Sequence, residues 1–143
     1  MSETRLFFYG TLRAAEVRHA VLGYNLPTAN LSYALLYNYQ VRRVQGALYP
    51  MLVPALAEQV TGLVATGLNR QAIRVLDQFE GQNYSRSALQ VDTAAGPLMA
   101  DVYLPHNILT AAELWDFDSW YKHDITTFMQ RDFRQSGVRP PSV

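Results

Sequence analysis

Short apolar runs, separated by glycine, proline and polar residues, dominate the first hundred positions of the chain. Runs of this kind are typical of buried strands. Six segments fit the pattern and are predicted to be strands: 6–9, 31–39, 46–50, 60–66, 88–92 and 98–104. Pro50 and Pro54 are expected to end the third of them. Gly96 and Pro97, in the segment 93–97, predict a hairpin turn between the last two.

One segment has the spacing of an amphipathic helix. Ile73, Leu76 and Phe79 recur at intervals of three residues. Asn69 precedes them as a good N-cap, and Gly81 follows at the position where a left-handed residue often ends a helix. The spacing therefore predicts a helix between Asn69 and Gly81. The segment 17–30 shows no such period and is expected to be a loop with at most one helical turn.

The chain from about residue 110 onward is also compatible with a helix. Thr110 and Glu113 have the spacing of a capping box. The helical pattern continues to about Phe133 and is expected to break near Asp118. An aromatic stretch in this region is either a partner-binding face or the packed side of a helix, and core packing is favoured. Its members are Trp115, Phe117, Trp120, Tyr121 and Phe128.

These elements predict an α+β fold, in which a small mixed β-barrel carries flanking helices. Strands outnumber helices and do not alternate with them, which argues against a doubly wound parallel sheet. A chain of 143 residues corresponds to a single domain, residues 1–143. We expect the motif-bearing core at about 5–104, a helical segment at about 110–134 and a frayed tail at 135–143.

Composition narrows the class of protein. Twelve Lys and Arg residues balance twelve Asp and Glu residues, so the formal net charge is zero. Most nucleic-acid-binding domains rely on a basic excess that is missing here. The chain has no cysteine, which excludes disulfides and thiolate nucleophiles. No signal peptide is recognisable, and no apolar run approaches the roughly 18–20 residues that span a bilayer. We expect a cytoplasmic protein with no nucleic-acid or membrane partner.

The motifs of several enzyme classes are absent from the sequence. It contains no Walker A loop, no G-x-G-x-x-G after a strand and no G-x-S-x-G elbow. His19, His106 and His123 are far apart and have no partner at the spacing of metal ligands. Lys122, the only lysine, fits neither a P-loop nor a Schiff base. No metal site is expected.

The first candidate site is the segment Tyr9, Gly10, Thr11 and Leu12, at the end of the first predicted strand. A glycine in such a turn allows successive backbone N–H groups to point the same way. Such a concavity binds carboxylates or developing oxyanions without a charged side chain. The alternative is an ordinary strand-ending turn, which spacing alone does not distinguish.

The second candidate is Glu80. In a helix, Ile73, Leu76 and Glu80 share one face, which places a carboxylate on the apolar side, while Asp77 falls on the solvated side. Burial and the negative end of the helix dipole would both raise the pKa of Glu80. A carboxyl group tuned in this way suits general acid/base work near neutral pH. The alternative is that the helix frays and leaves Glu80 exposed.

Tyr84 and Arg86 follow where the chain enters the next strand. Either side chain could hydrogen-bond a ligand or the Glu80 carboxylate. Spacing alone is equally compatible with a tyrosine on a sheet face and a surface arginine.

Four segments in order along the chain resemble motifs of the γ-glutamylcyclotransferase-like family, which includes avirulence-induced-like (AIG2-like) proteins and γ-glutamylamine cyclotransferases. An apolar strand followed by Y-G-[ST]-L matches residues 7–12, a glycine with a Tyr-Pro pair matches 46–50, and V-x-G-x-[LV] matches 60–64. The motif L-D-x-[FY]-E-G-x-x-Y-x-R matches residues 76–86 at every fixed position. The resemblance covers about residues 5–104.

The resemblance implies a small β-barrel with flanking helices, and it assigns roles to residues. Glu80 would be the catalytic acid/base. The turn would supply backbone donors to the substrate. The implied substrate-binding residues are Tyr9, Gly10, Thr11, Leu12 and Tyr84, with Arg86 and Tyr49 as further candidates.

The implied enzyme is of a transferase or lyase type and needs no cofactor. The α-amine of a γ-glutamyl group attacks its own γ-carbonyl and releases 5-oxoproline together with an amine or amino acid. Because the substrate brings its own nucleophile, no serine or cysteine elbow is required. Two alternatives remain: the same fold acting on another small substrate, and a non-catalytic ligand-binding or partner-binding domain. The leaving group and the oligomeric state are not indicated by the sequence.

Overall fold

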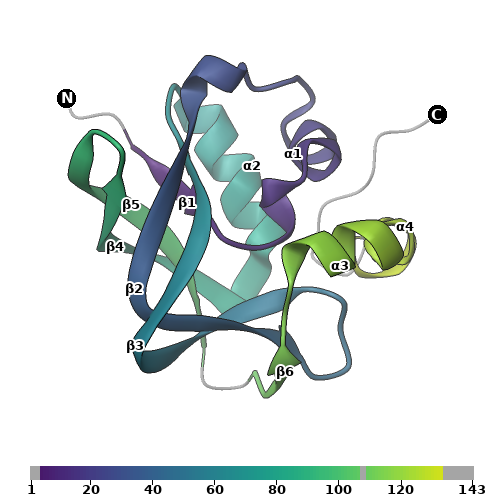
Figure 1. Cartoon of the computed structure of the whole chain (residues 1–143). Coiled ribbons are helices and arrows are strands. Elements are labelled where there is room, and N and C mark those ends of the chain that lie inside the picture. Colours follow the sequence, from purple (N-terminus) through teal and green to yellow (C-terminus); the bar gives the residue numbers. More distant parts are fainter. Residues whose placement is uncertain (1–3, 107–108, 134–143) are drawn as a thin grey trace.

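The computed structural model describes residues 4–106 and 109–133, which form a closed mixed β-barrel with helices packed on its outside (Figure 1). The barrel order is β3, β1, β5, β4 and β2, and β2 pairs again with β3 to close the ring. The strands are β1 Leu6–Phe8, β2 Leu31–Val44, β3 Pro50–Ala65, β4 Tyr84–Thr93, β5 Gly96–Pro105 and β6 Ala111–Leu114. The predicted α+β barrel with flanking helices is confirmed.

β1 is buried on both faces because it lies between the barrel interior and the helices. Leu6 and Phe8 belong to the core shared with the helices, whereas Phe7 and Tyr9 belong to the core inside the barrel. This explains why its sequence shows no alternation of apolar and polar residues. Packing is so close here that a Cβ on Gly62 of β3 would lie 2.6 Å from the Phe7 ring.

β2 and β3 form one long antiparallel hairpin, which the sequence predicted only in pieces. Asn38 and Ala57, with φ of 68° and 69°, mark an irregularity in its register, and Asn38 Oδ1 accepts a hydrogen bond from the Ala57 N–H at 3.1 Å. The expectation that prolines end a strand at 46–50 is wrong, because β3 begins at Pro50 and runs through Pro54. Within the described residues both prolines pair only with β2, and proline is tolerated where one strand edge needs no donor.

Two local predictions are confirmed. β4 and β5 pair along their whole length, from Tyr84 opposite Pro105 to Thr93 opposite Gly96, with the turn where glycine predicted it. The helix α2 spans Arg70–Glu80 and is capped by Asn69, whose side chain accepts a hydrogen bond from the Ala72 N–H at 2.8 Å. Both signals are local in sequence, so they did not depend on tertiary packing.

The segment expected to be a loop contains a helix, α1, over Ala15–Leu22. Its N-cap is Ala14, which makes no side-chain capping bond, and it ends at Gly23 in the left-handed conformation. Val17 and Val21, four residues apart, bury one face of this short helix. The prediction was wrong because this helix lacks a capping signal and is stabilised by packing on the core.

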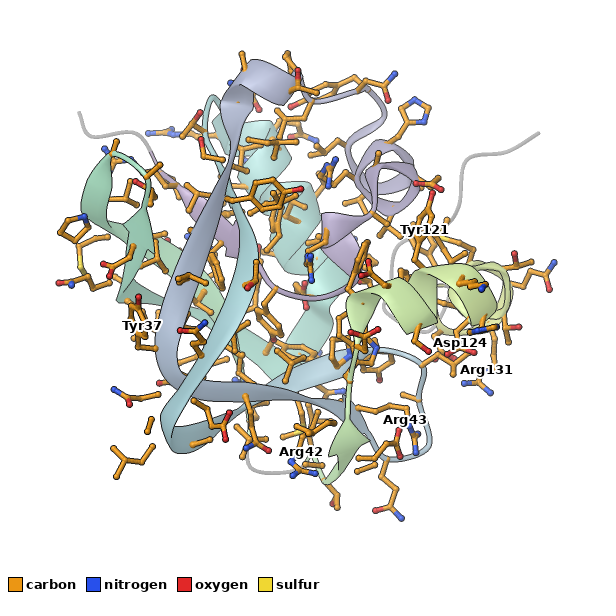
Figure 2. The ribbon with its side chains drawn as sticks, in the orientation of Figure 1. Tyr37, Arg42, Arg43, Tyr121, Asp124 and Arg131 are labelled. Atoms are coloured by element: carbon orange, nitrogen blue, oxygen red, sulfur yellow. The ribbon has the colours of Figure 1, made fainter. Side chains whose placement is uncertain are left out.

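The predicted capping box at Thr110 and Glu113 is also wrong. Residues Ala111–Leu114 form β6, which pairs with β2, and Glu113 binds Arg43 of β2 through an ion pair of 2.5 Å. Arg42 and Arg43 both lie beside β6 at the lower end of the molecule (Figure 2). Pairing with a strand some 70 residues earlier therefore overrides the local helical pattern.

The C-terminal helical segment begins later than expected. Asp116 caps α3, Phe117–His123, by accepting a hydrogen bond from the Ser119 N–H at 2.9 Å. The break falls at Asp124 rather than near Asp118, and it is followed by α4, Ile125–Thr127, and a π-helical turn, Phe128–Asp132. The predicted tail at 135–143 lies outside the described residues.

The aromatic stretch mainly packs into the core, as predicted. Trp120 and Phe128 are buried, and the Phe128 ring lies 6.5 Å from that of Phe79 on α2. Tyr121 is more exposed, and its hydroxyl hydrogen-bonds Glu16 of α1 (Figure 2). Among the described residues, no helix is long and apolar enough to cross a membrane.

Candidate functional site

A cavity of about 730 Å³ opens where the end of β1, the end of α2 and the start of β4 meet. It brings together five parts of the chain that are distant in sequence. Its lining comes from residues 7–12, 49–50 and 77–84, together with Tyr103 and Phe128. The predicted residues Glu80, Tyr9, Gly10, Thr11, Leu12, Tyr84 and Tyr49 therefore all line one cavity.

Glu80 enters this cavity because of how α2 ends. It is the last residue of the helix, and Gly81 follows with φ 77° and ψ −166°, a conformation open almost only to glycine. The chain reverses at Gly81, whose N–H donates to the Asp77 carbonyl, and it returns along β4 from Tyr84. The Glu-Gly pair thus directs both Glu80 and Tyr84 to the cavity wall.

The Glu80 carboxyl group is half-buried and, within the described residues, forms no hydrogen bond or ion pair with another side chain. Burial raises its pKa from 4.5 to about 8, and the nearby negative charge of Asp77 adds to the rise. Because Glu80 is part of the cavity lining, a ligand in the cavity has access to it. Such a carboxyl group exchanges its proton near neutral pH.

Asp77, one turn earlier on α2, is in a different environment. Arg86 binds both of its oxygens, at 2.7 and 3.1 Å, and the Tyr103 hydroxyl donates to it at 2.7 Å. Arg86 also binds Asp101 of β5 at 2.7 Å. The side chain of Asp77 is 42% exposed, in agreement with its predicted place on the solvated side, and the ion-pair network holds it at the rim of the cavity.

Arg86 does not line the main cavity. Together with Ser85 it lines a smaller adjoining depression. Two carboxylates already engage its guanidinium, so it is not a free cation for a substrate. The ion pair with Arg86 fixes the position of Asp77 in the cavity lining. Neither a ligand contact nor a simple surface position for Arg86 had included this structural role.

The turn after β1 has the shape that its glycine allows. A Cβ on Gly10 would lie 2.8 Å from Cγ of Pro50, so the turn packs directly against this proline. The Arg13 and Ala14 N–H groups bond back to the carbonyls of Gly10 and Thr11, both at 3.0 Å. Within the described residues, the N–H groups of residues 10–12 have no such partner, which leaves three consecutive donors beside the cavity.

Tyr9, Tyr49 and Tyr84 lie close to Glu80, as does Tyr103. The hydroxyl of Tyr9 donates to the Tyr103 carbonyl and that of Tyr84 to the Pro50 carbonyl, each at 2.8 Å. Burial is the main cause that raises the pKa of the phenols of Tyr9, Tyr49 and Tyr84. Since the protons of Tyr9 and Tyr84 are engaged, their oxygens can only accept from a ligand. The Tyr49 hydroxyl has no hydrogen-bond partner in the described part of the chain and remains a donor.

Arg13 directly follows the turn residues Tyr9–Leu12. It does not line the cavity, but neither does it extend into solvent: its guanidinium lies 4.4 Å from the centre of the Phe117 ring. This cation–π contact joins the turn to α3.

No cluster of three or more potential metal-binding side chains occurs in the described ranges 4–106 and 109–133.

Sequence reasoning gave no role in the site to Asp77, Tyr103 or Phe128, which all line the cavity. Asp77 is a fixed position of the 76–86 motif, which was a signal for it. Tyr103 and Phe128 carried no motif, and they reach the cavity through the barrel register and the C-terminal packing. Their contribution follows from contacts across distant parts of the chain.

Comparison with known proteins places these residues in a family context. The family model described as "Gamma-glutamyl cyclotransferase, AIG2-like" matches residues 6–122. AIG2-like protein C of Arabidopsis thaliana is 32% identical over 130 residues, which cover 87% of this chain and 73% of the relative. AIG2-like protein D of the same plant is 28% identical over 144 residues, covering 96% and 93%.

Solved structures have the same fold. A solution structure from Arabidopsis thaliana superimposes with a TM-score of 0.69 at 23% identity, covering 94% of this chain and 82% of that one. A structure described as "Gamma-glutamyl cyclotransferase" gives a TM-score of 0.64 at 16% identity, covering 99% and 91%. At these identities the likeness concerns the fold alone.

Proposed function

Since this chain belongs to the gamma-glutamyl cyclotransferase, AIG2-like family, we propose that it cyclises a small γ-glutamyl substrate, with Glu80 as the general acid/base. The α-amine of the γ-glutamyl group attacks the γ-carbonyl carbon of the same group. The new N–C bond closes the ring of 5-oxoproline, and the C–N bond to the leaving amine or amino acid breaks.

The observation that carries this proposal is the state of Glu80. Its carboxyl group lines the cavity, pairs with no cation among the described residues and has a pKa of about 8. A purely structural glutamate at this place would be expected to bind an arginine, as Asp77 does. An unpaired, partly desolvated carboxyl group is unfavourable for stability but suited to proton transfer.

The available donors suggest how the substrate lies. Within the described residues no unpaired Arg, Lys or His lines the cavity, so the consecutive N–H groups of residues 10–12 are the donors best placed for the α-carboxylate of the substrate. The α-ammonium would then face acceptors, namely Glu80 and the phenol oxygens of Tyr9 and Tyr84. A Tyr49 hydroxyl without a partner is available to the oxyanion that develops on the γ-carbonyl.

The proton balance requires one carboxyl group. Binding the ammonium beside Glu80 favours the carboxylate, because an opposite charge lowers the pKa of an acid. Glu80 then takes a proton from the ammonium, which frees the amine for attack. Glu80 first passes this proton to the leaving nitrogen as the C–N bond breaks, and it then carries the second proton from the new ring nitrogen to the released amine. Both protons lost by the substrate ammonium thus end on the leaving group, so neither water nor an external co-reactant is consumed.

Incubation with a panel of γ-glutamyl amines, amino acids and peptides tests the proposal. We expect 5-oxoproline and the free amine in a one-to-one ratio, measured by mass spectrometry. The variant Glu80→Gln should form neither above the uncatalysed rate. If no member of the panel is turned over but a small molecule still binds in the cavity, the protein acts on another substrate or is a binding domain.

A further inference from the structure

A buried arginine stands behind the turn that the proposed function uses. Arg18 lies on α1 and is only 8% exposed. Its Nη1 donates to the carbonyl oxygen of Leu12 at 2.9 Å and to that of Arg13 at 2.8 Å. Both acceptors are backbone groups of the turn, so the side chain reaches back from the following helix to the segment that enters it.

The charge of this guanidinium is not neutralised locally. Within the described residues, Arg18 forms no ion pair with a carboxylate. Burial lowers its pKa, and the nearby charge of Glu16 partly opposes this effect. An arginine nevertheless stays protonated in proteins. A buried positive charge therefore remains beside a turn whose residues line the cavity.

The hydrogen bonds of the backbone groups of residues 10–13 show what Arg18 does for the turn. The Gly10 and Thr11 carbonyls accept from the N–H groups of Arg13 and Ala14. The next two carbonyls, of Leu12 and Arg13, accept from Arg18. All four carbonyls of residues 10–13 are thereby satisfied, while the N–H groups of residues 10–12 stay without a partner in the described chain. What the turn offers to a ligand is thus donors rather than acceptors.

We propose that Arg18 is a positioning residue, which holds the carbonyls of Leu12 and Arg13 so that the turn binds the substrate carboxylate through its free N–H groups. Without it, two carbonyls would lack donors, and the peptide planes would be free to rotate. Its unpaired charge also favours an anion at the turn over water. The inference rests on the proposed substrate-binding role of Tyr9–Leu12 and adds a residue that does not touch the substrate.

Glutarate is a suitable probe because it has the five-carbon chain and one terminal carboxylate in common with a γ-glutamyl group. A second carboxylate stands in place of the γ-amide, and there is no amine, so glutarate binds without reacting. Its affinity should be measured by calorimetry for the wild type, Arg18→Met, Arg18→Lys and Arg74→Met. Arg74→Met is the matched control, since it removes one positive charge from an exposed site on α2 outside the cavity. We expect about tenfold or more weaker binding for Arg18→Met, partial recovery for Arg18→Lys and no change for the control.

Kinetics separate a positioning role from a merely structural one. With any γ-glutamyl substrate that is turned over, Arg18→Met should raise KM more than it lowers kcat, because the α-carboxylate is bound before the chemical step. Arg18→Met that melts earlier but binds glutarate like the wild type would overturn the inference and leave the proposed function intact. Loss of glutarate binding in a protein that turns over no γ-glutamyl compound would support the inference and contradict the proposed function instead.

If Arg18→Met does not fold, the wild type supplies the test. NMR should show slowly exchanging Arg18 guanidinium protons, which shift when glutarate is added together with the amide signals of residues 10–12. Amide shifts at the turn without any response of the Arg18 guanidinium signals would overturn the inference.

Discussion

Arg86 binds both carboxylate oxygens of Asp77, at 2.7 and 3.1 Å, across the gap between α2 and β4. Glu80 lies one helical turn beyond Asp77 and, within the described residues, has no such partner. Two carboxylates on the same helix thus have different environments: one is neutralised by a cation and the other is surrounded by apolar groups and phenols. This difference makes Glu80 the group that changes protonation near neutral pH.

The substitution Glu80→Gln should abolish turnover and preserve the fold. The amide has almost the same volume as the carboxyl group, but it cannot exchange a proton near pH 7. We expect kcat/KM to fall by about 10²–10⁴-fold, measured by 5-oxoproline release. Retained activity together with a lower melting temperature would show that Glu80 is structural.

The same variant should reveal the cost of ionising Glu80. Its pKa is 4.5 when exposed and about 8 in the folded protein, so the folded state holds the proton more tightly than the unfolded chain. The protonated Glu80 therefore contributes fully to the free energy of unfolding below pH 4.5. This contribution is lost as the pH rises toward 8, by at most about 1.4 kcal/mol per pH unit. Glu80→Gln should therefore gain stability relative to the wild type between pH 5 and pH 8 in urea unfolding. If the free energies of unfolding of Glu80→Gln and the wild type differ by the same amount at pH 5 and at pH 8, the raised pKa of Glu80 is contradicted.

The pH dependence of kcat/KM should follow Glu80 in the free enzyme. We expect it to rise with pH and to level off above an apparent pKa of about 8. Asp77→Asn removes the second cause of the raised pKa, so its profile should shift to lower pH. Burial, the larger cause, remains and keeps the pKa above 4.5. Asp101→Asn removes the other partner of Arg86 and serves as the matched control, with a smaller shift expected.

Gly10→Ala should damage the turn. The new Cβ would lie 2.8 Å from Cγ of Pro50, and since the proline ring is rigid, the backbone has to move. We expect a loss of about 1–3 kcal/mol in stability and weaker glutarate binding. Gly23→Ala is the control: it has φ 81° and open space around it, so it should cost stability without affecting glutarate affinity. Equal affinity in both variants would exclude the turn from ligand binding.

Leaving groups without a carboxylate should be preferred. The described part of the cavity offers one set of free backbone donors and no unpaired cation, because Arg86 already binds Asp77 and Asp101. A γ-glutamyl amino acid brings a second carboxylate that would find no partner, whereas a γ-glutamyl amine does not. We expect kcat/KM to be higher for a γ-glutamyl amine than for the γ-glutamyl amino acid of matching size. The reverse order would place an additional cation at the site.

The sequence by itself determined the features that depend on neighbouring residues. Asn69 and Gly81 bound α2 because a side-chain cap and a glycine with positive φ both act within one helical turn. The spacing of Leu76 and Glu80 placed the carboxylate on the buried side for the same reason. The turn at Gly10 and the hairpin at Gly96 were equally local, so their positions followed from short motifs.

Only the tertiary structure decided the features that join distant segments. β6 replaced a predicted capping box because the pairing of residues 111–114 with β2 outweighs local helix propensity. Asp77 has partners in the fold because Arg86 and Tyr103, from β4 and β5, meet it at the rim of the cavity. Arg18 was hidden in a segment expected to be a loop, and its contacts required α1 to form. Such contacts depend on how the barrel closes and on what packs against it, and no short stretch of sequence contains that information.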